Sequence, residues 1–131
     1  MLKDCPIVPY IPVTDLGRAR TFYEEVVGLV PMQESPNGVA YAAGNGSWVF
    51  MYLSGNAGTS KASQAFWQVT DLTAEMAELR ARGLRFEEYD FPELKTVDGV
   101  FTGGGARTAW FKDSEGNTMA LVQTLPAPRD K

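Results

Sequence analysis

One sequence plan occurs twice in this chain, and the repeat limits the fold more than any other feature. The tetrapeptide Val-Thr-Asp-Leu stands at residues 13–16 and again at residues 69–72. In each copy an apolar segment precedes the aspartate, an amphipathic stretch follows it, and a glycine ends that stretch, at Gly28 and at Gly83. A chain with this pattern is expected to fold as two similar supersecondary units.

The stretch after each aspartate is typical of an amphipathic helix. Asp15 can accept hydrogen bonds from the free amides of the first turn, and its charge suits the positive end of the helix dipole. Apolar residues then recur at helical spacing on one face: Leu16, Ala19, Phe22, Tyr23 and Val26. Gly28 ends the helix, because glycine enters the left-handed conformation without steric cost. Asp71 and Gly83 predict a second helix in the same way.

The rest of the chain is predicted to form strands separated by turns. The expected strands cover residues 6–13, 30–34, 39–43, 47–54, 65–69, 84–89, 107–112 and 118–124. The sequence therefore predicts one α+β domain, residues 1–131, made of two tandem βαβββ modules at about 5–54 and 64–124. Residues 55–63 join the modules as a flexible linker or as a ligand-facing loop. Because each helix covers one sheet face, the other face is free to curl around a ligand as a cup.

Composition excludes several classes of function. The 131 residues carry a net charge of −4, so we expect no nucleic-acid partner. No segment approaches the twenty or so apolar residues of a membrane span, and the first residues lack a signal-peptide pattern, so we expect a cytoplasmic protein. Cys5 is the only cysteine, either a plain strand residue or a reactive thiol. The chain has no histidine, the usual general base and metal ligand.

Three motifs taken together identify a family resemblance. They are Val-x-Asp-Leu-x-x-Ala-x-x-Phe-Tyr from residue 13 with Gly28-Leu29, its echo across residues 69–83, and Phe-x-Asp-x-x-Gly-Asn at residues 111–117. This combination resembles the vicinal oxygen chelate superfamily, the group of glyoxalase I, the extradiol dioxygenases and the bleomycin-resistance proteins. The resemblance implies paired βαβββ modules, a U-shaped mixed sheet with helices on its outer face, and commonly a homodimer.

The resemblance also implies where a metal would be held, by His or Glu on equivalent strands. Counting five residues back from each Val-x-Asp gives Val8 in the first module and Gln64 in the second. The last strand of the first module gives Met51, and Ala120 stands where the family often has glutamate. Valine and alanine offer no donor atom, a thioether suits hard cations poorly, and a neutral amide is weak. We therefore expect neither a metal nor another cofactor.

Residues in phase with these four positions are expected to line the cup, because alternate residues of a strand share a face. The expected lining is Val8, Tyr10, Pro12, Val49, Met51, Leu53, Gln64, Phe66, Gln68, Thr118, Ala120 and Val122. The opposite phase, including Ile11, Trp67 and Leu121, is expected to pack against the helices. An apolar lining with a few hydrogen-bonding groups suits a small, partly aromatic organic molecule. The alternative is that these side chains pack together and fill the cup.

The long loop expected at residues 90–106 supplies further candidates. Asp90, Lys95 and Arg107 are expected to overhang the second module, and we place Arg107 among the ligand-binding residues. Asp90 and Lys95 could transfer a proton, or they could simply form a solvated loop. Tyr10 could donate to a ligand oxygen. Tyr10, Asp90 and Lys95 are therefore the weak catalytic candidates.

The sequence is compatible with three functions. The first is a metal-independent binding protein that resembles the drug-binding members of the superfamily and works as a homodimer. The second is a metal-free, glyoxalase-like lyase or isomerase that uses Tyr, Asp or Lys on a small carbonyl compound. The third is a structural or regulatory dimer with a vestigial pocket. The missing histidines and metal donors favour the first, although one fold supports many functions.

Overall fold

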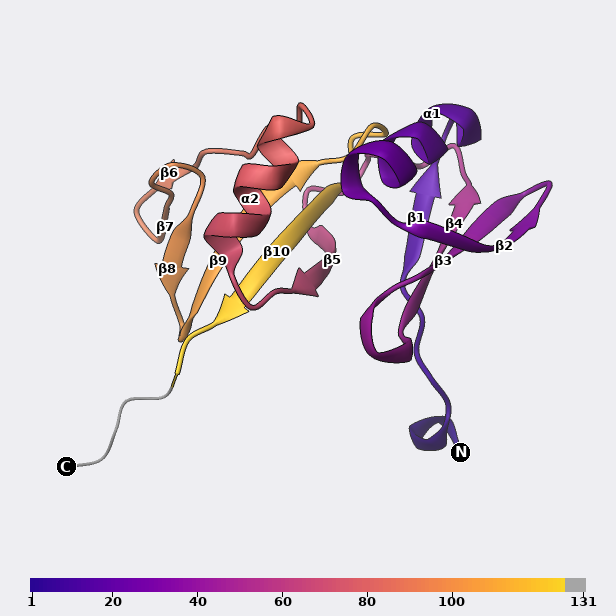
Figure 1. The fold of residues 1–131 in the computed structure, drawn as a ribbon, viewed down its shortest axis with the longest axis horizontal. Helices are drawn as coiled ribbons and strands as arrows, with labels where there is room; N and C mark the ends of the chain where they lie inside the picture. Colours follow the sequence, from indigo (N-terminus) through magenta and orange to yellow (C-terminus); the bar gives the residue numbers. More distant parts are fainter. Residues whose placement is uncertain (127–131) are drawn as a thin grey trace.

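Two four-stranded mixed sheets lie side by side in the computed structural model, which describes residues 1–126 (Figure 1). The strand order is β1-β4-β3-β2 in the first sheet and β5-β10-β9-β8 in the second. In both sheets the first strand of the module pairs in parallel with the last, and the other pairings are antiparallel. This shared connectivity confirms the predicted α+β fold of two repeated modules.

Each half has one strand, a helix and then three strands of its sheet, and the second half has the additional β6–β7 hairpin. The first half contains η1 (Leu2–Asp4), β1 (Tyr10–Val13), α1 (Leu16–Thr21), the π-helix η2 (Phe22–Val27), β2 (Val30–Ser35), β3 (Gly38–Ala42), η3 (Gly44–Gly46) and β4 (Trp48–Leu53). The second contains β5 (Ser63–Gln68), α2 (Leu72–Ala81), β6 (Asp90–Phe91), β7 (Leu94–Lys95), β8 (Phe101–Gly103), β9 (Ala106–Lys112) and β10 (Thr118–Thr124). Across the described residues, every helix is too short or too polar to span a bilayer.

Both predicted helix caps form. Asp15 accepts a hydrogen bond from the Arg18 amide at 3.0 Å, and Asp71 accepts one from the Ala74 amide at 3.1 Å. The first helix differs from the prediction, because after Thr21 it continues as the π-helix η2. The Tyr23 carbonyl there accepts from the amide of Gly28, which ends the helix at φ 90°. A π-helical turn shifts the helical phase, so the adjacent side chains of the predicted stripe can both reach the core.

The outer strand of the second sheet does not lie where the pattern placed it. The predicted strand at residues 84–89 is reduced to a single bridge between Phe86 and Phe111. The chain then forms the small β6–β7 hairpin and returns as β8, within the predicted loop. The prediction of a strand at residues 84–89 was therefore wrong. The outer strand is β8 instead, and its sequence carries no strand pattern because it is only three residues long and contains Gly103.

The helix-facing sides of both sheets contribute to one hydrophobic core. Its sheet residues are Ile11, Val13, Val39, Tyr41, Val49, Met51, Ala109, Phe111, Met119 and Leu121. α1, η2, α2 and the segment after α2 add Ala19, Tyr23, Leu72, Met76, Leu79 and Leu84. Ile11 and Leu121 therefore pack on the side that their phase predicted.

Met51 and its neighbours in β4 face the opposite way from the prediction. Met51 is fully buried and lies in register with Ile11 and Val39, which are also core residues. Val49 likewise packs in the core. The predicted cup position at Met51 is therefore wrong, because side chains alternate along a strand and an offset of one residue reverses the face. Phe50 and Tyr52 occupy the open face instead.

Gly38 provides a test of the packing between β3 and β4. A Cβ atom at Gly38 would lie 2.5 Å from the Met51 carbonyl oxygen and 2.6 Å from the Phe50 ring. Because the carbonyl belongs to a paired strand and cannot move freely, Gly38→Ala should destabilise the protein by about 1–3 kcal/mol. Chemical denaturation measures this change. Gly44→Ala, where nothing lies within 4 Å of the new Cβ, is the control and should change stability by less than about 0.5 kcal/mol.

Candidate functional site

The open side of the first sheet carries a group of aromatic residues, here called the first aromatic face. Its members are Tyr10 of β1 and Trp48, Phe50 and Tyr52 of β4. The Tyr10 ring lies 6.0 Å from the Phe50 ring and 4.7 Å from the Tyr52 ring, both in edge-on geometry. Tyr10 is 64% exposed. Small residues of β3 pair with β4 on this side, including Ala40 opposite Phe50, so the aromatic rings dominate the surface.

The open side of the second sheet carries the second aromatic face. Its members are Phe66, Tyr89, Phe91, Phe101 and Trp110. The Trp110 ring lies 5.5 Å from that of Tyr89 and 6.3 Å from that of Phe101. Ala120 lies in register between Phe66 and Trp110, where its small side chain leaves room. Phe66 is 60% exposed and Phe91 55%, so this face is also open to solvent.

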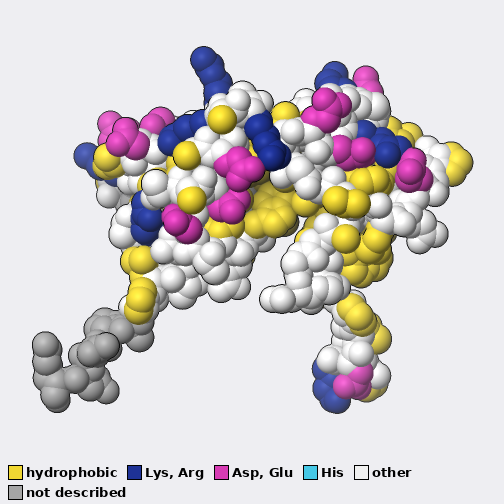
Figure 2. All heavy atoms as spheres, in the orientation of Figure 1, with side chains coloured by type: hydrophobic (Ala, Val, Ile, Leu, Met, Phe, Trp, Pro, Cys, Tyr) yellow, Lys and Arg dark blue, Asp and Glu magenta, His cyan; other side chains and the backbone are white. Residues whose placement is uncertain are grey.

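A groove of about 1050 Å³ runs between the two modules, and each aromatic face contributes one residue to its lining. Trp48 of the first face and Phe66 of the second both line it, along with Ile7 and Gln68. Figure 2 shows hydrophobic side chains exposed in the hollow between the two halves of the molecule. The volume suits an organic molecule of drug size.

Most of the predicted cup residues lie on the open faces or close to them. Tyr10, Gln64, Phe66, Gln68 and Ala120 have the expected phase, and the Gln64 amide donates to the Tyr10 carbonyl at 3.4 Å. This contact places the two predicted positions next to each other across the modules. Val8 is half-buried and precedes the first strand. Neither Phe50 nor Trp110 was predicted to be a site residue. Alternation along β4 would have identified Phe50 if the count had started one residue away from Met51.

Arg107 does not lie where the sequence analysis placed it. It shares the phase of the core residues Ala109 and Phe111, and it donates to the Thr73 hydroxyl of α2 at 3.3 Å. Arg107 therefore lies on the helix side of the second sheet, away from the aromatic faces, and its role in ligand binding stays a prediction. Asp90 and Lys95 do meet, with 3.6 Å between their charged atoms, but both side chains are exposed on the β6–β7 hairpin.

The residues present do not suit the divalent metal that the family resemblance implies. At the implied ligand positions Val8 and Ala120 provide no donor atom, Met51 is buried in the core, and Gln64 offers only a neutral amide. Within residues 1–126, no group of three His, Cys, Asp or Glu side chains is arranged to hold a metal ion.

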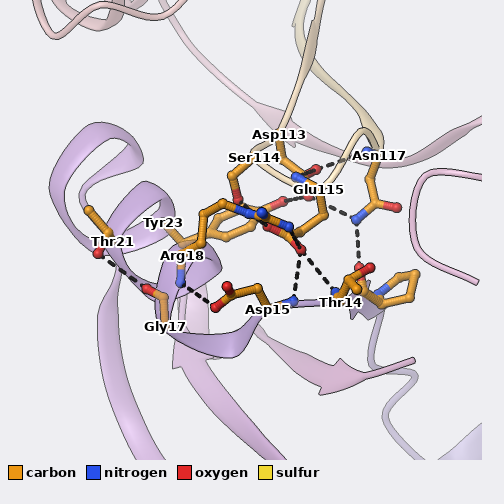
Figure 3. A network of polar contacts seen from close by, with 11 residues as sticks. Thr14, Asp15, Gly17, Arg18, Thr21, Tyr23, Asp113, Ser114, Glu115 and Asn117 are labelled. Carbon is orange, nitrogen blue, oxygen red and sulfur yellow. Dashed lines mark hydrogen bonds and ion pairs between the residues drawn. The ribbon is translucent and has the colours of Figure 1, made fainter. Parts of the chain in front are cut away.

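A buried polar network joins the two modules at the turn between β9 and β10 (Figure 3). We call the turn at residues 113–117 the clasp, because it lies between β9 and β10 and contacts the β1–α1 corner of the first module. The buried Glu115 carboxylate accepts from the backbone amides of Thr14 and Asp15 at 2.9 and 3.0 Å. Arg18 adds two hydrogen bonds, at 2.8 and 2.9 Å. The clasp therefore stabilises the relative position of the modules.

The environment of Glu115 favours its charged form. The hydrogen bonds from Arg18 lower the pKa of Glu115 to about 2, and backbone donation from Asp15 and Thr14 adds to this effect against the opposing effect of burial. Tyr23 is an uncharged member of the same network, and its hydroxyl donates to the Asp113 carboxylate at 2.5 Å. Burial and the neighbouring Asp113 charge raise the pKa of Tyr23 far above its usual range. This tyrosine therefore acts as a structural donor.

Asn117 completes the clasp. Its amide donates to the Pro12 carbonyl of β1 at 2.7 Å and to Asp113 at 2.9 Å, and its side-chain oxygen accepts from the Gly58 amide at 2.9 Å. These contacts give a structural reason for the motif Phe-x-Asp-x-x-Gly-Asn at residues 111–117. Glu115 and Asn117 thus join residues far apart in sequence, because their contacts with Thr14 and Pro12 span 101 and 105 residues of chain.

The chain resembles known proteins in sequence pattern and in fold. Residues 7–121 match the model of the glyoxalase/bleomycin resistance protein/dioxygenase superfamily. No curated protein matches the chain in sequence. Among solved structures, TnmS3, an antibiotic binding protein from Streptomyces sp. CB03234, is 22% identical, with a TM-score of 0.67 over 91% of this chain and 96% of its own.

Two further structures have the same fold. A glyoxalase/bleomycin resistance protein/dioxygenase from Alicyclobacillus acidocaldarius is 16% identical, with a TM-score of 0.68 over 92% of this chain and 91% of its own. A lactoylglutathione lyase from Agrobacterium tumefaciens is 15% identical, with a TM-score of 0.65 over 91% of this chain and 93% of its own. At these identities the likeness establishes the fold and leaves the function to the site.

Proposed function

Because the chain belongs to the glyoxalase/bleomycin resistance protein/dioxygenase superfamily, we propose that it binds a small, largely apolar or aromatic organic molecule without a metal ion. The observation that carries this proposal is the pair of exposed aromatic faces, each of which contributes one residue, Trp48 or Phe66, to the groove between the modules. An aromatic ligand between these faces would gain stacking contacts in addition to the burial of its apolar surface. The antibiotic-binding structure with the same fold is consistent with this use.

A few polar groups beside the aromatic rings would orient the ligand. Gln68 is exposed on β5 at the groove, and the Gln64 amide lies beside Tyr10 at the junction of the modules. Val8 and Ala120 would add apolar contacts at the margins. The proposed site therefore combines an apolar surface with a small number of hydrogen-bonding groups, which is typical of sites for small organic molecules.

A second copy of the chain would complete this site. Tyr10, Phe66 and Phe91 are each more than half exposed, and large apolar patches of this kind are uncommon on a monomer. In the proposed homodimer the aromatic face of one copy covers that of the other and encloses the ligand between them. Sedimentation analysis should give a mass of about twice the 14.3 kDa chain.

The enzyme alternative has weaker support. The only acid–base pair among its candidates, Asp90 and Lys95, lies exposed on the β6–β7 hairpin, where water screens the interaction. Tyr10 contacts other aromatic rings and has no general base beside it among the described residues. If the protein were instead a lyase or isomerase, Asp90→Asn or Tyr10→Phe would lower turnover of a carbonyl substrate without unfolding the protein.

Ligand-induced stabilisation tests the proposed function directly. Dialysed protein should be stabilised by polycyclic aromatic compounds, by about 2.7 kcal/mol when the free ligand is present at 100 times its Kd. Differential scanning calorimetry measures the shift. Adding EDTA should leave the shift unchanged, since no metal takes part. The proposal would be wrong if a broad set of aromatic compounds gave no shift, or if EDTA removed the shift.

A further inference from the structure

A separate pocket of about 750 Å³ lies on the helix side of the second sheet. It opens between α2, the segment at residues 95–102 and the start of β9. Arg107 faces this pocket, whereas Thr108 has the opposite phase along β9. The second aromatic face and the pocket are therefore on opposite sides of the same sheet, and one ligand cannot occupy both.

Basic side chains from three different elements line the pocket. Arg80 comes from α2, Lys95 from β7 and Arg107 from β9. Two acidic side chains, Glu88 and Asp98, also line it, which leaves a formal excess of one positive charge. The chain as a whole carries a net charge of −4, so this local excess opposes the general trend of the surface. A locally positive concave surface attracts small anions.

The two arginines are held in place by contacts that leave their charge unneutralised. Arg80 lies over the Phe86 ring, 5.2 Å from its centre, and donates to the Asp98 carbonyl at 2.9 Å. Arg107 donates to the Thr73 hydroxyl. Within residues 1–126, neither arginine forms a salt bridge with a carboxylate. Each guanidinium therefore keeps N–H donors for an oxyanion, for which its planar geometry is well suited.

The nearby carboxylates already have partners or lie apart from the guanidinium groups. Glu88 accepts a hydrogen bond from the Thr96 hydroxyl at 2.5 Å. Asp98 occupies a tight turn at φ 52°, and it is its backbone carbonyl that contacts Arg80. Lys95 pairs only loosely with Asp90, at 3.6 Å and with both side chains exposed. These acids therefore offset the positive charge without occupying the arginine donors.

The floor of the pocket is apolar. Met76 of α2 is almost fully buried there, and Val100 is half-buried beside it. Val97 is 73% exposed at the rim. A ligand that carried both an oxyanion and a short apolar body would thus satisfy both parts of the lining.

We propose that this pocket binds a small organic oxyanion. The charged group lies between Arg107, Arg80 and Lys95, and its apolar body contacts Met76 and the two valines. This site is independent of the aromatic ligand site, because it lies on the other side of the sheet. The inference therefore stands whether or not the proposed function is correct.

Titration of the 131-residue chain with two matched compounds tests the proposal. Cyclohexanecarboxylate should bind and shift the amide resonances of Thr73 and Thr102, which line the pocket. The neutral isostere cyclohexanecarboxamide should bind at least tenfold more weakly. Inorganic phosphate, which lacks an apolar body, should also bind more weakly than the carboxylate. Equal binding of the amide would overturn the role of charge, and equal binding of phosphate would overturn the role of the apolar floor.

Variants separate this site from general electrostatic attraction. Arg107→Gln should weaken cyclohexanecarboxylate binding at least tenfold and leave the thermal midpoint nearly unchanged, because Arg107 makes a single contact with α2. If Arg107→Gln is unstable, Lys95→Gln at an exposed position measures the effect of losing a positive charge from the pocket on cyclohexanecarboxylate binding. Lys61→Gln removes the same charge at an exposed position outside the pocket and should change Kd less than twofold. Equal weakening by Lys61→Gln, or resonance shifts confined to the aromatic faces, would contradict the proposal.

Discussion

Replacing Glu115 with glutamine should lower the free energy of unfolding at pH 7 by about 2–3 kcal/mol, because it breaks a buried charged contact between the modules. The carboxylate accepts from two backbone amides of the β1–α1 corner and pairs with Arg18 (Figure 3). Glutamine would place an amide donor where an acceptor is needed, beside donors that have no other partner. Arg18 is partly exposed and can be rehydrated, so the loss stays below that of a fully buried pair.

The same contact predicts how stability depends on pH. The pKa of Glu115 is about 2 in the folded protein, lowered from 4.5, so the folded state holds this proton more weakly than the unfolded state. Its contribution is fully present above about pH 5 and is lost as the pH falls towards 2. The acid-induced decrease in stability should therefore be steeper for the natural protein than for Glu115→Gln. Urea denaturation at pH 7, 5, 4 and 3 measures both effects.

A charge-matched control tests whether the location of Glu115 matters. Glu25 is exposed and forms no salt bridge in the described part of the chain, so Glu25→Gln should change stability by less than about 0.5 kcal/mol. Its acid profile should follow that of the natural protein. If Glu115→Gln and Glu25→Gln behaved alike, the clasp would contribute nothing specific to stability.

Truncation of Trp110 should have the largest effect on ligand binding. Trp110 lies at the centre of the second aromatic face, with Tyr89 and Phe101 against it and Ala120 in register beside it. Central aromatic residues of an interface commonly contribute 2 kcal/mol or more. Trp110→Ala should therefore weaken the binding of an aromatic ligand by roughly 30-fold, since each 1.4 kcal/mol is a factor of ten. Isothermal titration calorimetry measures the change.

The matched control for Trp110 is an exposed apolar residue outside both faces. Met32 of β2 is 55% exposed, so Met32→Ala removes apolar surface without touching the proposed site. Its Kd should stay within about twofold of the natural protein. Trp110→Phe should restore most of the affinity, because a smaller ring keeps the stacking surface. Unchanged affinity in a folded Trp110→Ala protein would show that the ligand does not bind at the second aromatic face.

Local signals in the sequence were enough to predict the helices and the repeated modules. Asp15 and Asp71 cap helices in the structure as their positions implied. Strands were harder to predict where local pattern and tertiary pairing disagreed. Residues 84–89 have alternating character but form only one bridge, whereas β8 pairs with β9 despite its glycines. In that strand the pairing with β9 outweighs the weak propensity of the residues.

The site was predicted only in part, for reasons of geometry. Alternation along β1 and β5 correctly placed Tyr10 and Phe66 on the open side. The same rule failed at Met51, because the starting position was off by one residue and strand faces alternate with a period of two. Arg107 was expected at the start of a strand and overhanging the second module, but its side chain lies on the α2 side of β9, because alternate residues of a strand point to opposite faces.

The sequence by itself therefore determined the two modules, their helix caps and the absence of histidine and other suitable donors at the implied metal positions. These properties depend on residue identity and on spacing within one element, which the chain carries locally. The tertiary structure alone decided that Trp48 and Phe66 meet at one groove, that Glu115 holds the first module, and that Arg80 and Arg107 share a pocket. Each of these depends on which distant strands and helices pack together, because contacts of long sequence separation leave no periodic signal in the chain.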